Sequence, residues 1–124
     1  MLTLYEEITE DLTPYEIETV LPLVSEAIKK YKGKEAAITA TTICKRMNRS
    51  GLIEGYIMNT VKVRKIMGAI RLLGLVHNIC SGARGYYVGT NAEEIAECIE
   101  SLEQRVRQQT RVIEALKSQS RIIK

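Results

Sequence analysis

The fold is decided by residues 59–89, which read NTVKVRKIMGAIRLLGLVHNICSGARGYYVG. The first half of this stretch carries apolar residues that fall on one helical face at about 100° per residue, namely Val63, Ile66, Met67, Ile70 and Leu73. Asn59 is a favoured N-cap residue, and Gly74 readily adopts the left-handed conformation that ends helices. The pattern therefore predicts a helix from Asn59 to about Leu73.

The second half of the stretch changes from helical spacing to strand-like composition. Residues 75–80 and 86–88 are rich in β-branched and aromatic residues, which favour strands. Residues 81–85 contain two glycines and predict a hairpin loop between the two strands. A helix followed directly by a hairpin is thus expected.

Upstream of this stretch, the chain predicts two more helices. Thr13, Pro14 and Glu16 form a helix start with a capping box, and Pro22 is expected to kink or divide that helix near residue 21. Residues 37–39 are expected to form a very short strand, and Thr39 or Thr41 to cap a second helix. Residues 48–56 read as a loop, and the acidic residues 1–12 as a short helix or a frayed arm.

The charge of the chain is unevenly distributed along its 124 residues. The net charge of +3 is the sum of −4 over residues 1–35, +7 over residues 36–91 and zero over residues 92–124. The length fits one domain, and its core must be aliphatic because Trp and Phe are absent. A basic middle section between an acidic arm and a neutral tail indicates a partner of negative charge.

Several functional classes are disfavoured by the sequence. Cys44, Cys80, Cys98 and the single His77 lie at spacings that do not suit a metal site, so reduced and mostly buried thiols are expected and no metal or cofactor. We find no phosphate-binding loop, dinucleotide-binding motif or HExxH motif, and we expect no enzyme activity. No apolar run reaches the roughly 18 residues of a membrane span, and no signal peptide is recognisable, which predicts a cytoplasmic protein.

Three helices followed by a hairpin are the layout of a winged helix-turn-helix module, in which the third helix can enter the major groove and the hairpin, or wing, can lie on the neighbouring backbone. We therefore predict a mainly α (α+β) fold with a two-stranded wing and a long C-terminal coiled-coil-like helix. The expected divisions are an acidic arm over residues 1–12, the winged-helix domain over 13–90 and the long helix over 91–124.

Local motifs strengthen this interpretation. The segments VRKIM at 63–67, IR at 70–71, GLV at 74–76 and GYYV at 85–88, followed by the helix start TNAEE at 90–94, resemble a group of small prophage-type winged-helix proteins. The resemblance covers about residues 36–115 and implies a phage-like DNA-binding module. The loop after residue 48 is longer than the tight turn of a typical helix-turn-helix.

The candidate DNA contacts are the basic residues of the second and third helices and of the hairpin tip. Arginine suits bidentate contact with guanine, whereas charged helix faces often serve only solvation. The third helix carries four basic residues and no acidic one, which favours contact with DNA. The candidates are Lys45, Arg46, Arg49, Lys62, Arg64, Lys65, Arg71 and Arg84.

From Ala92 the chain predicts a helix of about 30 residues with a heptad repeat. β-Branched residues at one seam position and leucines at the other favour a parallel pair, whereas the acidic first half and basic second half favour an antiparallel one. Packing of the stripe on the protein's own first helix is the third possibility. The expected self-association residues are Ile95, Ile99, Leu102, Val106, Gln109, Ile113 and Leu116.

Two functions remain open from the sequence. The first is a homodimeric winged-helix protein that binds double-stranded DNA in transcription regulation or replication. The second is a protein-protein interaction or adaptor module that uses the same fold and a coiled-coil tail without significant DNA affinity, because fold does not fix function. The basic charge of the third helix ranks DNA binding first.

Overall fold

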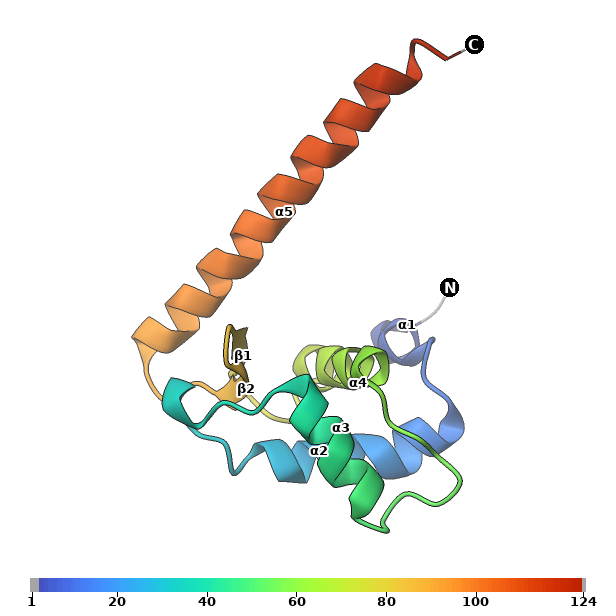
Figure 1. Ribbon diagram of the computed structural model, residues 1–124, viewed down its shortest axis with the longest axis vertical. Coiled ribbons are helices and arrows are strands. Elements are labelled where there is room, and N and C mark those ends of the chain that lie inside the picture. The colour runs from blue at the N-terminus through green and yellow to red at the C-terminus, as the bar shows by residue number, and fades with distance from the viewer. Residues whose placement is uncertain (1–2, 124) are drawn as a thin grey trace.

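The computed structural model describes residues 3–123, and it is mainly helical with one two-stranded antiparallel sheet. Figure 1 shows a body of short helices from which one long helix projects as a rod. No helix in the described part of the chain is long and apolar enough to cross a membrane. The elements in order are α1 (Leu4–Thr9), the π-helix η1 (Glu16–Val20), α2 (Leu21–Ile28), the 3-10 helix η2 (Lys34–Ala36), α3 (Ala40–Arg49), α4 (Thr60–Leu73), β1 (Ile79–Gly82), β2 (Gly85–Val88) and α5 (Ala92–Ser120).

The helix starts lie where short polar side chains can cap them, as predicted. Thr13 and Glu16 form the reciprocal capping box, with distances of 3.1 Å from the Glu16 N–H to Thr13 Oγ1 and 2.9 Å from the Thr13 N–H to Glu16 Oε1. Thr39 caps α3, Asn59 caps α4 and Asn91 caps α5. These local hydrogen bonds satisfy N–H groups that the first helical turn leaves unpaired.

The predicted division near residue 21 is confirmed. The helical run has π geometry up to Val20 and α geometry from Leu21 onward, with Pro22 in the first turn of α2. Proline has no N–H to donate to the carbonyl four residues earlier, so a regular α-helix cannot continue through it unchanged. The wider π turn absorbs this break without ending the helix.

The core is built around the inner face of α4. Its residues Val63, Ile66, Met67 and Ile70 are all buried, as the sequence predicted, and they form one cluster with the apolar faces of α2 and α3. Leu73 is only half-buried at the end of the helix, and Gly74 ends α4 in the left-handed conformation. The body thus fixes α4 by its apolar face and leaves the opposite face outward.

The hairpin is shifted from its predicted position. Its first strand covers Ile79–Gly82 rather than 75–80, and Gly82 pairs with Gly85, so the connecting turn consists of Ala83 and Arg84 alone. The segment before β1 forms turns because Asn78 adopts a left-handed conformation with φ of 64°. Asparagine tolerates this conformation better than most residues, and it interrupts any extended strand.

The predicted short strand at 37–39 appears as a single bridge. Ile38 and Tyr86 exchange two backbone hydrogen bonds of 2.9 and 2.8 Å, which adds a third, one-residue edge to the hairpin. Gly85 makes this approach possible, since a Cβ there would lie 2.2 Å from the Ile38 carbonyl oxygen. The hairpin is therefore fastened to the segment that leads into α3.

The acidic N-terminal segment forms a short helix that lies against the body. Residues Leu4–Thr9 make α1, which packs on α4, and Leu12 is buried in the core. Figure 1 shows α1 beside the end of α4. Residues 1–2 of the expected arm lie outside the described residues.

The C-terminal helix is confirmed as one continuous helix of 29 residues. Its first two turns pack on the body, where Ile95 and Cys98 lie against Cys80 and Tyr87 of the hairpin. The idea that its stripe packs on the protein's own first helix is wrong, because the side chains beyond Ser101 are exposed to the end of the described chain. Ile95 was expected to serve self-association, but it is half-buried against the hairpin instead.

Candidate nucleic-acid interface

A surface groove of about 390 Å³ lies where α3, α4, the hairpin and α5 meet. Thr39, the N-cap of α3, and Ala40, its first residue, form one side, and the hairpin forms another through Ser81, Gly82, Ala83, Gly85 and Tyr86. Three arginines line the groove from two helices, namely Arg64 and Arg71 of α4 and Arg105 of α5. A concave site with three guanidinium groups suits a polyanionic ligand.

Arg64 is the most available candidate on α4. Its side chain is exposed on the outward face, and it forms no ion pair or side-chain hydrogen bond with any residue of the described chain. Arg105, which the sequence did not single out, is likewise exposed and reaches the same groove. These two arginines can bind a ligand without breaking an existing contact.

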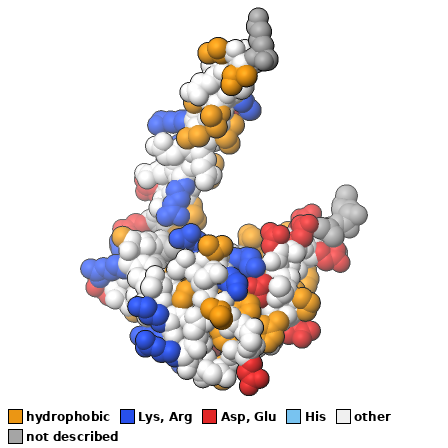
Figure 2. All heavy atoms as spheres, turned by 45° about the vertical axis from the view of Figure 1, so that its right-hand side comes forward, with side chains coloured by type: hydrophobic (Ala, Val, Ile, Leu, Met, Phe, Trp, Pro, Cys, Tyr) orange, Lys and Arg blue, Asp and Glu red, His pale blue; other side chains and the backbone are white. Residues whose placement is uncertain are grey.

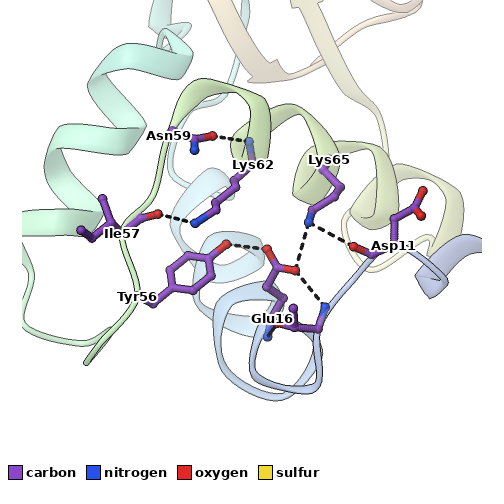
Figure 3. Close-up of polar contacts among 8 residues, drawn as sticks. Asp11, Glu16, Tyr56, Ile57, Asn59, Lys62 and Lys65 are labelled. Atoms are coloured by element: carbon purple, nitrogen blue, oxygen red, sulfur yellow. Dashed lines mark hydrogen bonds and ion pairs between the residues drawn. The ribbon is translucent and has the colours of Figure 1, made fainter.

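Lys65 points the other way, into the fold. Its Nζ lies 3.1 Å from Glu16 Oε1 and 3.1 Å from the Asp11 carbonyl oxygen, as Figure 3 shows. Glu16 is only 1% exposed, so its charge is removed from water and needs this partner. Lys65 therefore positions α4 against the N-terminal helices rather than facing a ligand.

Electrostatics show why the buried Glu16 remains charged. Burial alone would raise the pKa of Glu16, but hydrogen bonds from Tyr56 and Thr13, together with the Lys65 ammonium, hold the pKa below its usual value. The Tyr56 hydroxyl donates to Glu16 Oε2 at 2.5 Å. Burial and this carboxylate raise the pKa of Tyr56, so the phenol stays protonated as the donor.

Lys62 is also engaged by its surroundings. Its Nζ donates to the Ile57 carbonyl oxygen at 2.7 Å and lies 4.4 Å from the centre of the Tyr56 ring, as Figure 3 shows. These contacts fasten the start of α4 to the long loop between α3 and α4. Together with Glu16 and Lys65, they fix the orientation of α4 from its first two turns.

Arg71 lines the groove and also holds the hairpin in place through hydrogen bonds. Its Nε donates to the Ile79 carbonyl oxygen at 3.0 Å, and its Nη2 donates to Ser81 Oγ at 3.0 Å. The guanidinium lies 5.8 Å from the centre of the Tyr86 ring. A planar guanidinium with five donors can hold these partners and still present charge at the groove surface.

The remaining candidates lie on α3 and at the hairpin tip. Lys45 and Arg49 are exposed on α3 without a side-chain partner in residues 3–123, whereas Arg46 donates to the Tyr31 hydroxyl and lies over that ring. Arg84 pairs with Glu35 at 3.0 Å. Both side chains of that pair are well exposed, and such pairs are weak and screened by salt. An anionic ligand can therefore compete for Arg84.

The surface charges are unevenly distributed. In Figure 2, Asp and Glu side chains gather around the α1 end of the body, whereas the opposite side and the rod of α5 carry Lys and Arg side chains with some Asp and Glu among them. The acidic residues of α1 are Glu6 and Glu7. A polyanion would be repelled from the α1 end and attracted to the side that carries the groove.

The cysteines and the histidine form no metal or nucleophilic site in the part of the chain that is described. All three thiols are free and buried, as predicted, and His77 is exposed. Burial and the neighbouring Cys98 raise the pKa of Cys80 to about 11, which keeps its thiol protonated. No group of three metal-ligating side chains occurs among residues 3–123.

Comparison with known proteins adds no relative. No protein-family model, no curated protein and no solved structure matches the chain. The structural support for a function therefore comes from the residues and their geometry.

Of the sequence-predicted sites, the structure brings Arg64 and Arg71 together at the groove and directs Lys62 and Lys65 into contacts that support the fold. Sequence reasoning missed Arg105 because its position depends on the angle at which α5 leaves the hairpin. The only available signal was its place early in the basic half of the long helix.

Proposed function

We propose that this chain is a DNA-binding protein of the winged-helix class, with α4 as the helix that enters the major groove and the β1–β2 hairpin as the wing. The observation that carries the proposal is the groove in which Arg64, Arg71 and Arg105 converge between α4, the hairpin and α5. The resemblance to prophage-type winged-helix proteins supports a role in transcription regulation or replication.

The arrangement around the groove suits a duplex. The first turn of α3 presents backbone N–H groups beside the groove, and helix N-termini favour phosphate. Arg64 lies on the outward face of α4, from which a side chain can reach base edges. Arg84 at the hairpin tip and Lys45 and Arg49 on α3 would then contact the phosphate backbone on either side.

Binding to a labelled random duplex, measured by fluorescence anisotropy over a series of salt concentrations, tests this function. If about five phosphates are neutralised, the logarithm of the association constant should fall with a slope near −4 to −5 against the logarithm of salt concentration. Failure to bind at micromolar protein in low salt, or affinity that does not change with salt, would reject DNA binding.

Substitutions locate the site. Arg64→Ala and Arg105→Ala should each weaken duplex binding by about tenfold, since each removes one charge-assisted contact. The matched control is Lys30→Ala, which removes one exposed positive charge outside the groove and should change affinity much less. Equal losses in all three variants would show that binding depends on net charge and not on the groove.

A second candidate function is favoured by a different observation. Val61 and Leu72 of α4 are 67% and 70% exposed, although α4 is otherwise amphipathic. Residues eleven positions apart lie on the same helix face, and contiguous apolar patches on a protein surface mark sites of interaction with other proteins. An adaptor that binds another protein through this face would show negligible duplex affinity, so the same anisotropy experiment separates the two functions.

A further inference from the structure

The outward face of α4 presents an apolar side chain next to an exposed arginine. Val61 lies in the first turn of α4 and is 67% exposed. Arg64 follows three positions later, and it makes no ion pair or side-chain hydrogen bond within residues 3–123. Residues three positions apart are neighbours on a helix surface. A ligand that covers this face must therefore offer an apolar group and a hydrogen-bond acceptor close together.

The same face continues into open space at Gly68. A Cβ built on Gly68 would meet no atom within 4 Å. Positions 61, 64 and 68 follow the spacing i, i+3 and i+7, at which helices in the major groove present residues to base edges. The rise from Val61 to Gly68 is about 10.5 Å, which corresponds to about three base-pair steps. Lys65, at position i+4, takes no part because it is bound to Glu16.

We propose that Val61 and Arg64 read two neighbouring base pairs, Val61 by packing on the C5-methyl group of a thymine and Arg64 by binding O6 and N7 of a guanine. Thymine alone presents a methyl group in the major groove, and guanine presents two adjacent acceptors that match a guanidinium. The two residues are separated by about 4.5 Å along the helix, close to the rise of one base pair. This inference rests on the proposed DNA binding and adds which bases are recognised.

The surroundings of Val61 favour a nucleic acid over an apolar protein surface. All four charged residues of α4 are basic, and Arg64 lines the groove that it shares with Arg71 and Arg105. A duplex in the groove covers Val61 and supplies phosphates and base acceptors to these arginines in the same contact. An apolar protein surface would remove Arg64 from water without giving it a partner, which is unfavourable.

Selection from a pool of duplexes with a random central segment, followed by fluorescence anisotropy on a selected duplex, tests this inference. We expect the selected sequences to share a thymine and a guanine on neighbouring base pairs. Replacing that thymine by uracil removes only the methyl group and should weaken binding by about fourfold, the contribution of one buried methyl group. Replacing the guanine by 7-deazaguanine removes the N7 acceptor and should weaken binding by about tenfold.

Variants of α4 assign each base preference to one side chain. Val61→Ala should abolish most of the preference for thymine over uracil and keep the preference for guanine over 7-deazaguanine, whereas Arg64→Ala should do the reverse. Leu72→Ala is the matched control, because Leu72 is 70% exposed on the same face but lies about 16.5 Å further along α4. It should leave both preferences unchanged. Circular dichroism of each variant shows that the helices are retained.

The outcomes separate this inference from the proposed function. Selected sequences without a shared thymine and guanine, or equal affinity for the thymine and uracil duplexes, would overturn the base reading while salt-dependent binding to random duplexes still supported DNA binding. An equal loss of the thymine preference in Val61→Ala and Leu72→Ala would also overturn it. If the chain bound no duplex at micromolar protein in low salt, the proposed function would fail together with this inference.

Discussion

Helices α4 and α5 have the same sequence pattern, but the apolar face of α4 is buried and that of α5 is exposed. The apolar faces of both α4 and α5 recur at helical spacing. On α4, Ile66 and Ile70 are fully buried in the core, whereas on α5 Ile99 and Ile113 are about half exposed. Periodicity therefore predicts that a helix has an apolar face, but it does not predict whether the chain itself or another molecule covers that face.

The largest expected effect contrasts a core isoleucine with a tail isoleucine. Ile66→Ala should lower the free energy of unfolding by about 3–4 kcal/mol, since it leaves a cavity at a fully buried position. Ile113→Ala, measured at a concentration at which the chain is monomeric, should cost less than about 0.5 kcal/mol. Urea denaturation followed by circular dichroism measures both. A loss above about 1 kcal/mol at Ile113 in the monomer would mean that the body does cover the tail.

The attachment of the hairpin to the body can be broken at one glycine. Gly85→Ala should cost on the order of 2–3 kcal/mol, because φ is 114° there and the added Cβ would collide with the Ile38 carbonyl. Its register partner Gly82 has open space around it, so Gly82→Ala should cost less than about 1 kcal/mol. Thermal unfolding of the two variants compares them directly, and equal losses would contradict the close approach of Ile38.

The buried carboxylate makes the stability of the body depend on pH. Because the folded state lowers the pKa of Glu16, its contribution to stability is present above the unfolded value of about 4.3 and is lost as pH falls through the folded pKa. Glu16→Gln should cost about 2 kcal/mol at pH 7 and should reduce the slope of stability against pH below 4.3. Urea denaturation from pH 7 to pH 3 measures it.

The exposed Glu18 provides the control for that measurement. Glu18→Gln removes the same charge two residues away without touching Lys65 or Tyr56, and it should change the stability by less than about 0.5 kcal/mol. If Glu18→Gln flattened the pH profile as much as Glu16→Gln, the effect would come from net charge and not from the buried hydrogen bonds.

The sequence predicted best those features that are decided within a few residues. The caps at Thr13 and Asn59 were predicted, and Thr39 was one of two candidates for its helix, because an N-cap bond joins residues only three positions apart. The start of β1 was predicted four residues too early, since its composition favours a strand from residue 75 but the left-handed Asn78 interrupts it. Backbone conformation at a single residue is not visible in a composition pattern.

Contacts between distant segments were the part that sequence reasoning could not supply. Lys65 and Glu16 are 49 residues apart, and nothing in the sequence distinguishes Lys65 from the other cations of its helix. Arg105 reaches the groove only because Ile95 and Cys98 dock the first turns of α5 on the hairpin. The third helix was thus predicted correctly. Which of its basic residues hold the fold together and which of them line the groove depends on tertiary packing.

The smallest expected effect compares the stability of the body with that of the free part of α5. The chain allows this comparison because α4 and α5 begin with equivalent asparagine N-caps. Asn59 and Asn91 both accept a backbone hydrogen bond from the residue three positions later, at 2.8 and 2.9 Å, in similar extended conformations. Asn59→Ala should lower the free energy of global unfolding by about 1 kcal/mol, since α4 unfolds only with the core. Asn91→Ala should leave the unfolding midpoint of the body nearly unchanged and lower the helicity of the tail.

Hydrogen exchange of the monomer distinguishes these outcomes. An isolated helix of the length of the free tail is marginal in water, so amides beyond Ser101 should exchange much faster than those of α4, and Asn91→Ala should accelerate them further. If instead Asn91→Ala lowered the protection of α4 as much as Asn59→Ala does, the tail and the body would unfold as one cooperative unit. The contacts of Ile95 and Cys98 would then transmit stability along the whole of α5, which the exposure of its remaining side chains argues against.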